Sequence, residues 1–200
     1  MSDVSTAPTS PSSFAQAVPA DVLAAASAGV EHALESLFRS FQRAVWTLAL
    51  RLSDQRADAE EITQDAFLKA FQALPRYRGE APFGMWLRQI VVNEALMRRR
   101  SRVPLAELPE VLPDTAAQLP GSRQLDLQRS LAALPQPTRG VLWLYYVEGY
   151  THPEIAAAYG QSVSFSKSQV ARGAERLRQQ MAEPAGENTR PFGWGRESYA

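Results

Sequence analysis

The sequence predicts an all-α protein of two small helical domains that are joined by a flexible linker. Apolar residues recur every three or four positions in several long segments, which is the period of an amphipathic helix. No segment shows the alternating pattern that a half-buried strand needs. The proline-rich stretch 103–124 reads as an extended linker. It divides the 200 residues into domains at 31–102 and 125–181.

Three helices are expected in the first domain. The first covers residues 31–52 and carries a continuous apolar stripe. The second begins around Asp58, which precedes Glu61 at an Asp–Glu variant of the capping-box spacing, and it ends at Pro75. The third opens at Pro82, a residue favoured in the first turn of a helix, and it runs into a cluster of arginines.

The second domain is expected to be helical throughout. A short amphipathic helix at 126–134 precedes an apolar run at 138–147. Residues 151–154 match a capping box, Gly160 marks a turn, and a longer polar helix follows at 164–181. This layout is typical of a helix-turn-helix, whose second helix can enter the major groove of DNA. The alternative is an ordinary helical hairpin with a solvated polar face.

The two ends of the chain have compositions that favour disorder. Residues 1–30 are rich in Ser, Ala, Pro and Thr, and residues 182–200 contain several prolines and glycines. The aromatic residues of the C-terminal stretch either contact a partner or fold back on the protein.

Composition excludes several classes of site. The 21 basic and 21 acidic residues balance, so net charge indicates no partner. The absence of cysteine excludes disulfides and thiolate metal sites, and two distant histidines argue against a histidine metal centre. We expect no cofactor and no metal. No apolar run approaches the roughly 20 residues of a membrane span, and no signal peptide is recognisable. We expect a soluble cytoplasmic protein without membrane insertion, and nothing suggests a homo-oligomer.

Four motifs follow one another in a characteristic order and spacing. They are RADAEEITQDAF at 56–67, FGMWLRQIVVN at 83–93 followed by arginines, the set LP, YYVEGY and EIA at 134–135, 145–150 and 154–156, and GAERLR at 173–178. Together they resemble the extracytoplasmic-function (ECF) type of bacterial RNA polymerase sigma factor. The resemblance covers about 31–102 and 124–181 and leaves no room for a third domain.

The resemblance implies a factor that binds core RNA polymerase and directs promoter recognition, DNA melting and transcription initiation, without enzymatic activity. The first domain would be sigma region two, which binds polymerase and the minus-ten element. The second would be sigma region four, a helix-turn-helix for the minus-thirty-five element. An anti-sigma factor is a further expected partner, because the family commonly uses that control. The sequence does not name the promoters or the inducing signal.

The expected polymerase-binding residues lie on the second helix. Residues three and four apart are neighbours on a helix surface, so these side chains can share one face. By resemblance, this face docks on the clamp coiled coil of the largest polymerase subunit. A solvated helix face is the alternative. The residues are Glu61, Gln64, Asp65 and Leu68.

The expected minus-ten residues lie on the third helix. Trp86 and Asn93 are about two turns apart and project similarly. The amide of Asn93 can donate to and accept from a base flipped out of the melted strand, and arginines can hold the phosphates. The alternatives are a buried structural asparagine and a solvated basic helix end, which also suits the helix dipole. The set is Trp86, Arg88, Asn93, Arg98, Arg99 and Arg100, with Arg102 after it.

The expected minus-thirty-five residues lie on the last helix, where Arg and Gln can read base edges and Lys can hold phosphate. They are Ser164, Lys167, Ser168, Gln169, Arg172 and Arg176. The chain departs from the family at Gln161, Ser166 and Gln169–Val170, where apolar residues or an Arg-Leu pair are usual. Phe165 is expected to replace the lost aliphatic contact.

Two other functions fit the sequence less well. A helix-turn-helix regulator that never joins polymerase would explain residues 151–181, but it leaves the motifs at 58–67 and 86–93 without a purpose. An enzyme would need a phosphate loop, a metal cluster or a nucleophile–base pair, and the sequence shows none of these.

Overall fold

The computed structural model describes residues 12–101 and 129–182. Every regular element in these two ranges is a helix, which confirms the all-α class, and residues 129–132 are helical as well. The expected linker at 103–124 lies outside the described residues. The elements, in chain order, are α1 (Ala20–Ser27), α2 (Glu31–Leu52), α3 (Arg56–Ala73), the 3-10 turn η1 (Leu74–Arg76), α4 (Phe83–Ser101), α6 (Gln136–Tyr146), α7 (His152–Tyr159) and α8 (Val163–Ala182).

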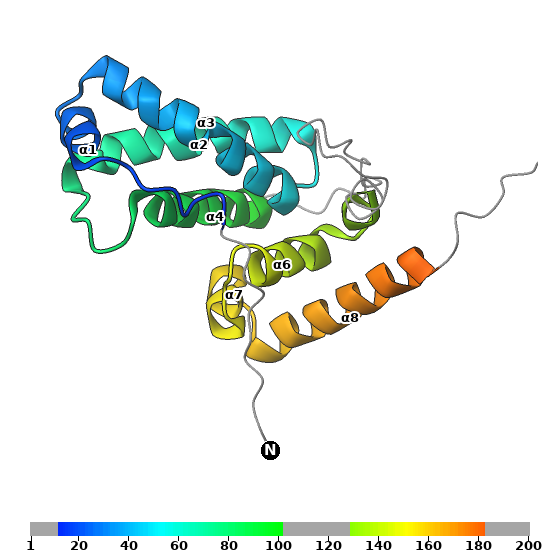
Figure 1. Cartoon of the computed structure of the whole chain (residues 1–200). Coiled ribbons are helices and arrows are strands. Elements are labelled where there is room, and N and C mark those ends of the chain that lie inside the picture. Colours follow the sequence, from blue (N-terminus) through cyan, green and yellow to red (C-terminus); the bar gives the residue numbers. More distant parts are fainter. Residues whose placement is uncertain (1–11, 102–128, 183–200) are drawn as a thin grey trace, which may run out of the picture.

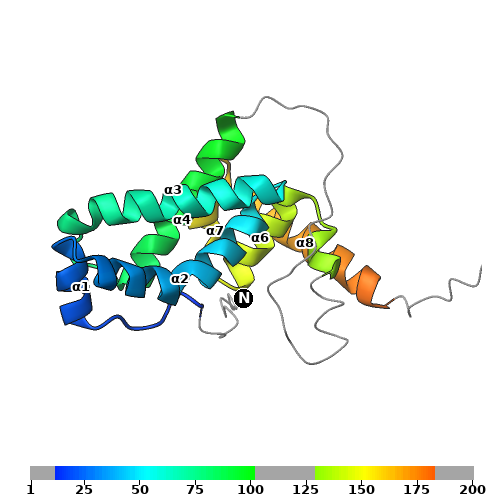
Figure 2. The ribbon, with the colours of Figure 1, turned by 90° about the horizontal axis from the view of Figure 1, so that it is seen from above.

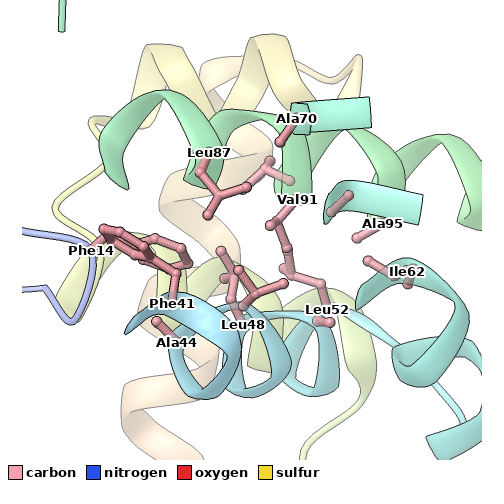
Figure 3. Packing of buried hydrophobic residues seen from close by; sticks show 14 of the residues in the cluster. Phe14, Phe41, Ala44, Leu48, Leu52, Ile62, Ala70, Leu87, Val91 and Ala95 are labelled. Carbon is pink, nitrogen blue, oxygen red and sulfur yellow. The ribbon is translucent and has the colours of Figure 1, made fainter. Parts of the chain in front are cut away.

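Helix α2 is the central element, because α1, α3, α4 and α6 all pack against it. Most of its predicted apolar stripe is buried, with Phe41 and Leu48 fully inaccessible to solvent. Leu87 and Val91 of α4 point into the same core (Figure 3). The helical period of the sequence thus predicts correctly which faces of α2 and α4 are inside.

The start of α3 differs from the prediction. The helix begins at Arg56, and its N-cap, Gln55, makes no side-chain capping hydrogen bond. Asp58 is buried in the first turn of the helix, where its carboxylate lies 4.0 Å from the guanidinium of Arg98. The capping box predicted with Asp58 as the N-cap is therefore wrong, because the N-cap is Gln55 and the Asp58 carboxylate forms an ion pair with Arg98 of α4.

The N-terminal segment is also more ordered than its composition suggests. Phe14 is fully buried, and its ring stacks on Phe41 with the ring centres 6.4 Å apart. Gly84 permits this approach, since a Cβ atom there would lie 2.0 Å from the carbonyl oxygen of Phe14. The predicted disorder of residues 1–30 is thus wrong for residues 12–30, because the Phe14 side chain and α1 pack against the hydrophobic core. Residues 1–11 lie outside the described part.

The second domain forms as the turn signals predict. Thr151 and Glu154 make the reciprocal hydrogen bonds of a capping box at the start of α7. Gly160 ends α7 in the left-handed conformation, with φ of 63°, which glycine adopts without steric cost. Helix α8 then crosses α6 closely, since a Cβ atom at Gly173 would lie 2.5 Å from a methyl group of Leu142.

A buried polar pair joins α7 to α8. The Ser166 hydroxyl is fully buried and lies 3.0 Å from Nδ1 of His152, whose ring stacks on Tyr145 at 4.6 Å. The Phe165 ring packs on the Tyr159 ring, with the ring centres 5.7 Å apart. The serine at this unusual position is thus accommodated by a hydrogen bond, and the aromatic neighbour supplies apolar contact.

The two domains share one hydrophobic core in this structure. Val141 and Leu144 of α6 and Ile155 of α7 belong to the same buried cluster as the residues of α2 and α4. Both views show α6 and α7 against α2 and α4, while α8 extends outward (Figures 1 and 2). Among the described helices, none is long and apolar enough to cross a bilayer. The predicted domain boundaries stay predictions.

Replacing Phe14 by alanine is expected to lower the free energy of unfolding by about 3–5 kcal/mol, the usual cost of removing a buried phenylalanine ring. Phe38→Ala is the matched control, because the Phe38 side chain is partly exposed, and it should cost less than half as much. Chemical denaturation followed by circular dichroism measures both. Wild-type stability in Phe14→Ala would show that the N-terminal segment does not contribute to the core.

A second expectation concerns pH. Desolvation, with a smaller contribution from Lys167, holds the pKa of His152 below its ordinary value of 6.5. The unfolded chain therefore binds this proton more tightly than the folded chain. The stabilising contribution of the neutral ring is fully present above about pH 6.5, and it is lost as the pH falls through the lower folded-state pKa.

We therefore expect the melting temperature of the wild type to fall more steeply than that of His152→Gln between about pH 7.5 and pH 5. The slopes are compared, because the variant also loses the stack on Tyr145. Parallel slopes would contradict the lowered pKa.

Candidate nucleic-acid interface

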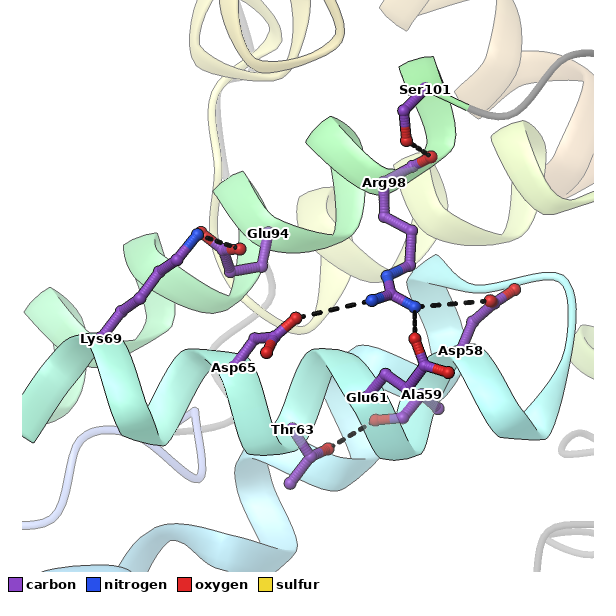
Figure 4. A network of polar contacts seen from close by, with 9 residues as sticks. All are labelled: Asp58, Ala59, Glu61, Thr63, Asp65, Lys69, Glu94, Arg98 and Ser101. Atoms are coloured by element: carbon purple, nitrogen blue, oxygen red, sulfur yellow. Dashed lines mark hydrogen bonds and ion pairs between the residues drawn. The ribbon is translucent and has the colours of Figure 1, made fainter.

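One arginine of α4 links the two sets of residues that the sequence singles out in the first domain (Figure 4). The guanidinium of Arg98 is hydrogen-bonded to Glu61, and it lies 3.5 Å from Asp65 and 4.0 Å from Asp58. The hydrogen bond to Glu61 is the largest cause that raises the pKa of Arg98 above its ordinary value. A predicted DNA-binding residue thus pairs with two predicted polymerase-binding residues.

The polymerase-binding set divides between two directions. Glu61 and Asp65 turn toward Arg98 of α4, whereas Gln64 is exposed and Leu68 is 57% exposed. Helix α3 therefore presents an amide and an aliphatic side chain to solvent beside a partly neutralised acidic pair.

Two neighbouring features were missed by the sequence reasoning. Phe38 lies on the apolar stripe of α2, yet its side chain is partly exposed. Its ring centre lies 4.7 Å from that of Phe67. Lys69 of α3 forms an ion pair of 2.6 Å with Glu94 of α4. The spacing of apolar residues in the sequence shows which side of a helix faces the core. It does not show whether a neighbouring helix covers each residue on that side.

Trp86 and Asn93 have different environments on α4. The Trp86 ring is half-buried, with ring centres 5.1 Å from Tyr77 and 5.7 Å from Phe83. Asn93 is exposed, and its Oδ1 accepts a hydrogen bond of 3.1 Å from Nε2 of Gln89. Trp86 thus contributes to an aromatic core, while the Asn93 amide is open to a ligand and is not a buried cap.

The arginines of α4 are used unequally. Arg88 is hydrogen-bonded to the carbonyl of Glu148, in the loop between α6 and α7. The Arg99 guanidinium lies over the ring of Tyr159 at 5.5 Å. Arg100 is exposed. Residues of the second domain therefore cover part of the predicted minus-ten surface.

The predicted minus-thirty-five residues lie mainly on the open face of α8. Gln169 is the exception, because its Oε1 accepts a hydrogen bond of 2.7 Å from the Thr138 hydroxyl of α6. Its amide is thereby turned toward its own domain. The exposed members are Ser164, Lys167, Ser168, Arg172 and Arg176.

Two family models match this chain. Residues 37–103 match the family described as Sigma-70 region 2, and residues 124–177 match Sigma-70 region 4. The first match contains α3 and α4, and the second contains α6, α7 and most of α8. Both regions belong to proteins that direct RNA polymerase to promoters.

Among curated proteins, the chain is 32% identical over 163 residues to the ECF RNA polymerase sigma factor SigE of Mycolicibacterium smegmatis, with 76% of this chain and 63% of that protein covered. It is 35% identical over 162 residues to the ECF sigma factor SigM of Mycobacterium tuberculosis, with 79% of this chain and 82% of that protein covered.

The fold also resembles that of the sigma factor RpoE from Bartonella quintana, solved with the anti-sigma factor NepR. The TM-score is 0.54 at 24% sequence identity, over 74% of this chain and 95% of that chain. Two sigma regions in the expected order, and relatives that match across both of them, place this chain in the ECF family of RNA polymerase sigma factors.

Proposed function

We propose that the chain binds core RNA polymerase through the exposed face of α3, opens promoters with α4 and contacts upstream duplex DNA with α8. The observation that carries the proposal is the exposure of predicted site residues on all three helices. Leu68 on α3, Asn93 on α4 and Arg172 on α8 are all accessible to solvent. These are chemically suited to an apolar protein contact, a flipped base and a phosphate, respectively.

The proposed function also implies where the protein acts and which partners it has. We infer a non-catalytic factor that acts in the cytoplasm beside its polymerase, and membership of the sigma family supports this. An anti-sigma factor is also proposed as a partner, because the structurally similar RpoE was solved in complex with one. A regulator that never joins polymerase is less favoured, since the match to sigma region two includes all of α3 and α4.

The direct test is transcription by core polymerase on sheared genomic DNA, with and without the chain, followed by sequencing of the transcript 5′ ends. New start sites that share upstream sequence elements are expected when the chain is added. An unchanged set of start sites would overturn the proposed function.

Charge reversal at Glu61 and Asp65 together is expected to weaken binding to core polymerase by about tenfold, which corresponds to roughly 1.4 kcal/mol. The reason is that an acidic docking face becomes basic. Glu60→Lys is the matched control, because the Glu60 side chain is 54% exposed, close to the 59% of Glu61, but pairs with Arg56. Titration of labelled chain with core enzyme measures all three proteins. Equal losses in the control would attribute the effect to net charge.

Replacing Asn93 by alanine is expected to leave thermal stability and core binding nearly unchanged, because the side chain is exposed and bonds only to Gln89 among the contacts of the described residues. Open-complex formation on duplex promoters should fall, since the flipped base loses its hydrogen-bonding partner. A pre-melted bubble should restore activity only in part. Normal transcription from duplex promoters would remove Asn93 from the mechanism.

A further inference from the structure

Two polar contacts attach α8 to the rest of its domain, and the proposed function leaves them unexplained. The Ser166 hydroxyl is fully inaccessible to solvent and lies 3.0 Å from Nδ1 of His152 in α7. Oε1 of Gln169 accepts a hydrogen bond of 2.7 Å from the Thr138 hydroxyl in α6. Ser166 and Gln169 are three residues apart and therefore lie on the same face of α8. These two tethers, His152–Ser166 and Thr138–Gln169, join one face of α8 to both α7 and α6.

Thr138 contacts α8 with both branches of its side chain. It is buried in the first turn of α6, and its hydroxyl donates to Gln169. Its methyl group lies against Gly173, where an added Cβ atom would be 2.7 Å from that methyl. Gln169 and Gly173 are four residues apart, which is about one turn of a helix. A single buried side chain of α6 thus contacts two successive turns of α8.

The tethers restrain the rotation of α8 about its axis more tightly than apolar packing alone does. A hydrogen bond weakens steeply when its angle departs from a narrow range, whereas the hydrophobic effect has no preferred direction. Rotation of α8 would break both tethers and would carry the side chains of the opposite face sideways. That face bears Lys167, Ser168 and Arg172, which are all exposed. Their positions relative to the rest of the domain therefore depend on the tethers.

Gln169 is poorly placed to read a base itself. Its side chain is half-buried, and its amide is turned toward α6. A glutamine reads adenine by donating from Nε2 and accepting at Oε1 at the same time. Because Oε1 of Gln169 already accepts from Thr138, this paired contact requires that the tether be broken first.

We propose that the two tethers set the base preference of α8 by fixing its rotation, so that Thr138 and Gln169 are positioning residues and Gln169 reads no base. The exposed face of α8 then makes the contacts with DNA, and the tethers decide which base pairs that face meets. The inference rests on the proposed function, because it requires that α8 contact the upstream duplex.

The test is transcription by core polymerase and the full chain from a start site that depends on the chain, with the upstream element randomised and each template marked by a transcribed barcode. Sequencing of the transcripts gives the base preference at every position. Thr138→Val removes the hydroxyl but keeps the shape of the side chain, and Gln169→Met removes the amide but keeps most of the length. Each variant is expected to lower transcription from the preferred element by about five- to tenfold, as for the loss of one hydrogen bond. Each should also change the preference at the same positions.

The double variant separates positioning from reading. Because both single changes break the same tether, Thr138→Val combined with Gln169→Met should be no worse than either change alone. Thr138→Ser keeps the hydroxyl and should retain the native base preference. Gln179→Met is the matched control, since Gln179 is exposed on the same helix and its amide is hydrogen-bonded to Glu175. It should leave the preference unchanged, and an equal change in this control would overturn the inference.

Ser166→Ala breaks the other tether and keeps the test decisive if Thr138→Val unfolds. It should shift the preference at the same positions as the Thr138 and Gln169 variants. Additive losses in the double variant would overturn the inference. So would a loss of discrimination at one base pair in Gln169→Met that Thr138→Val does not share, because Gln169 would then be a base reader.

The failure of this inference is distinguishable from the failure of the proposed function. If the wild type initiates with a clear upstream preference and the tether variants keep that preference, only the positioning role is wrong. If the wild type produces no start sites, or shows no preference over the randomised element, the proposed function itself has failed.

Discussion

The C-terminal end of α2 is the constraint on which the arrangement of the two domains depends. The last carbonyl groups of a helix have no partners within it, and leaving a buried one unpaired costs about 1–3 kcal/mol. Here the Ser53 hydroxyl donates to the carbonyl of Ala49 at 2.5 Å, while Gln136 and Arg139 donate to Leu52 and Arg51. Because the latter two donors come from α6, the C-terminal end of α2 in the first domain is completed by the second domain. Separation of the domains must expose these carbonyls to water, which then replaces the donors.

The residues at the start of α6 are suited to hydrogen-bonding the carbonyl groups at the end of α2. Arginine offers five donors in a planar fork, and Arg139 uses them on backbone carbonyls of α2 and of its own domain, including Leu134 at 3.2 Å. Burial among these groups lowers the pKa of Arg139 from its ordinary value. Gly140 follows it, and a Cβ atom there would lie 2.4 Å from the Tyr159 hydroxyl and 3.0 Å from a methyl group of Leu52. Arg139 supplies the hydrogen-bond donors, and Gly140 leaves the space that lets α6 lie close to both α2 and α7.

The sequence predicts the helices well because their signals are local. Period gives the buried stripe of α2, and the Thr151–Glu154 spacing gives a true capping box. Interactions between distant segments carry no such signal. Phe14 stands alone in a stretch of Ser, Ala and Pro, so its sequence neighbours predict an exposed side chain. In the structure its ring stacks on Phe41, and Gly84 leaves room for its backbone. Asp58 satisfies a capping pattern in the sequence, yet the structure pairs it with α4. The candidate residues could therefore be named from the sequence, but their pairing with one another could not.

The position of Arg98 shows why that pairing matters for function. The proposed polymerase-binding and DNA-binding surfaces lie on different helices and share one guanidinium, that of Arg98, which is paired with Glu61 and Asp65 of α3. A basic partner that approaches these carboxylates competes with Arg98 for them, and a phosphate that approaches Arg98 competes with the carboxylates. Competition of this kind couples the two binding events reciprocally, since each ligand alters the affinity for the other by the same factor. Under the proposed function, the charge on α3 therefore influences DNA binding on α4 even though no residue of α3 needs to touch DNA.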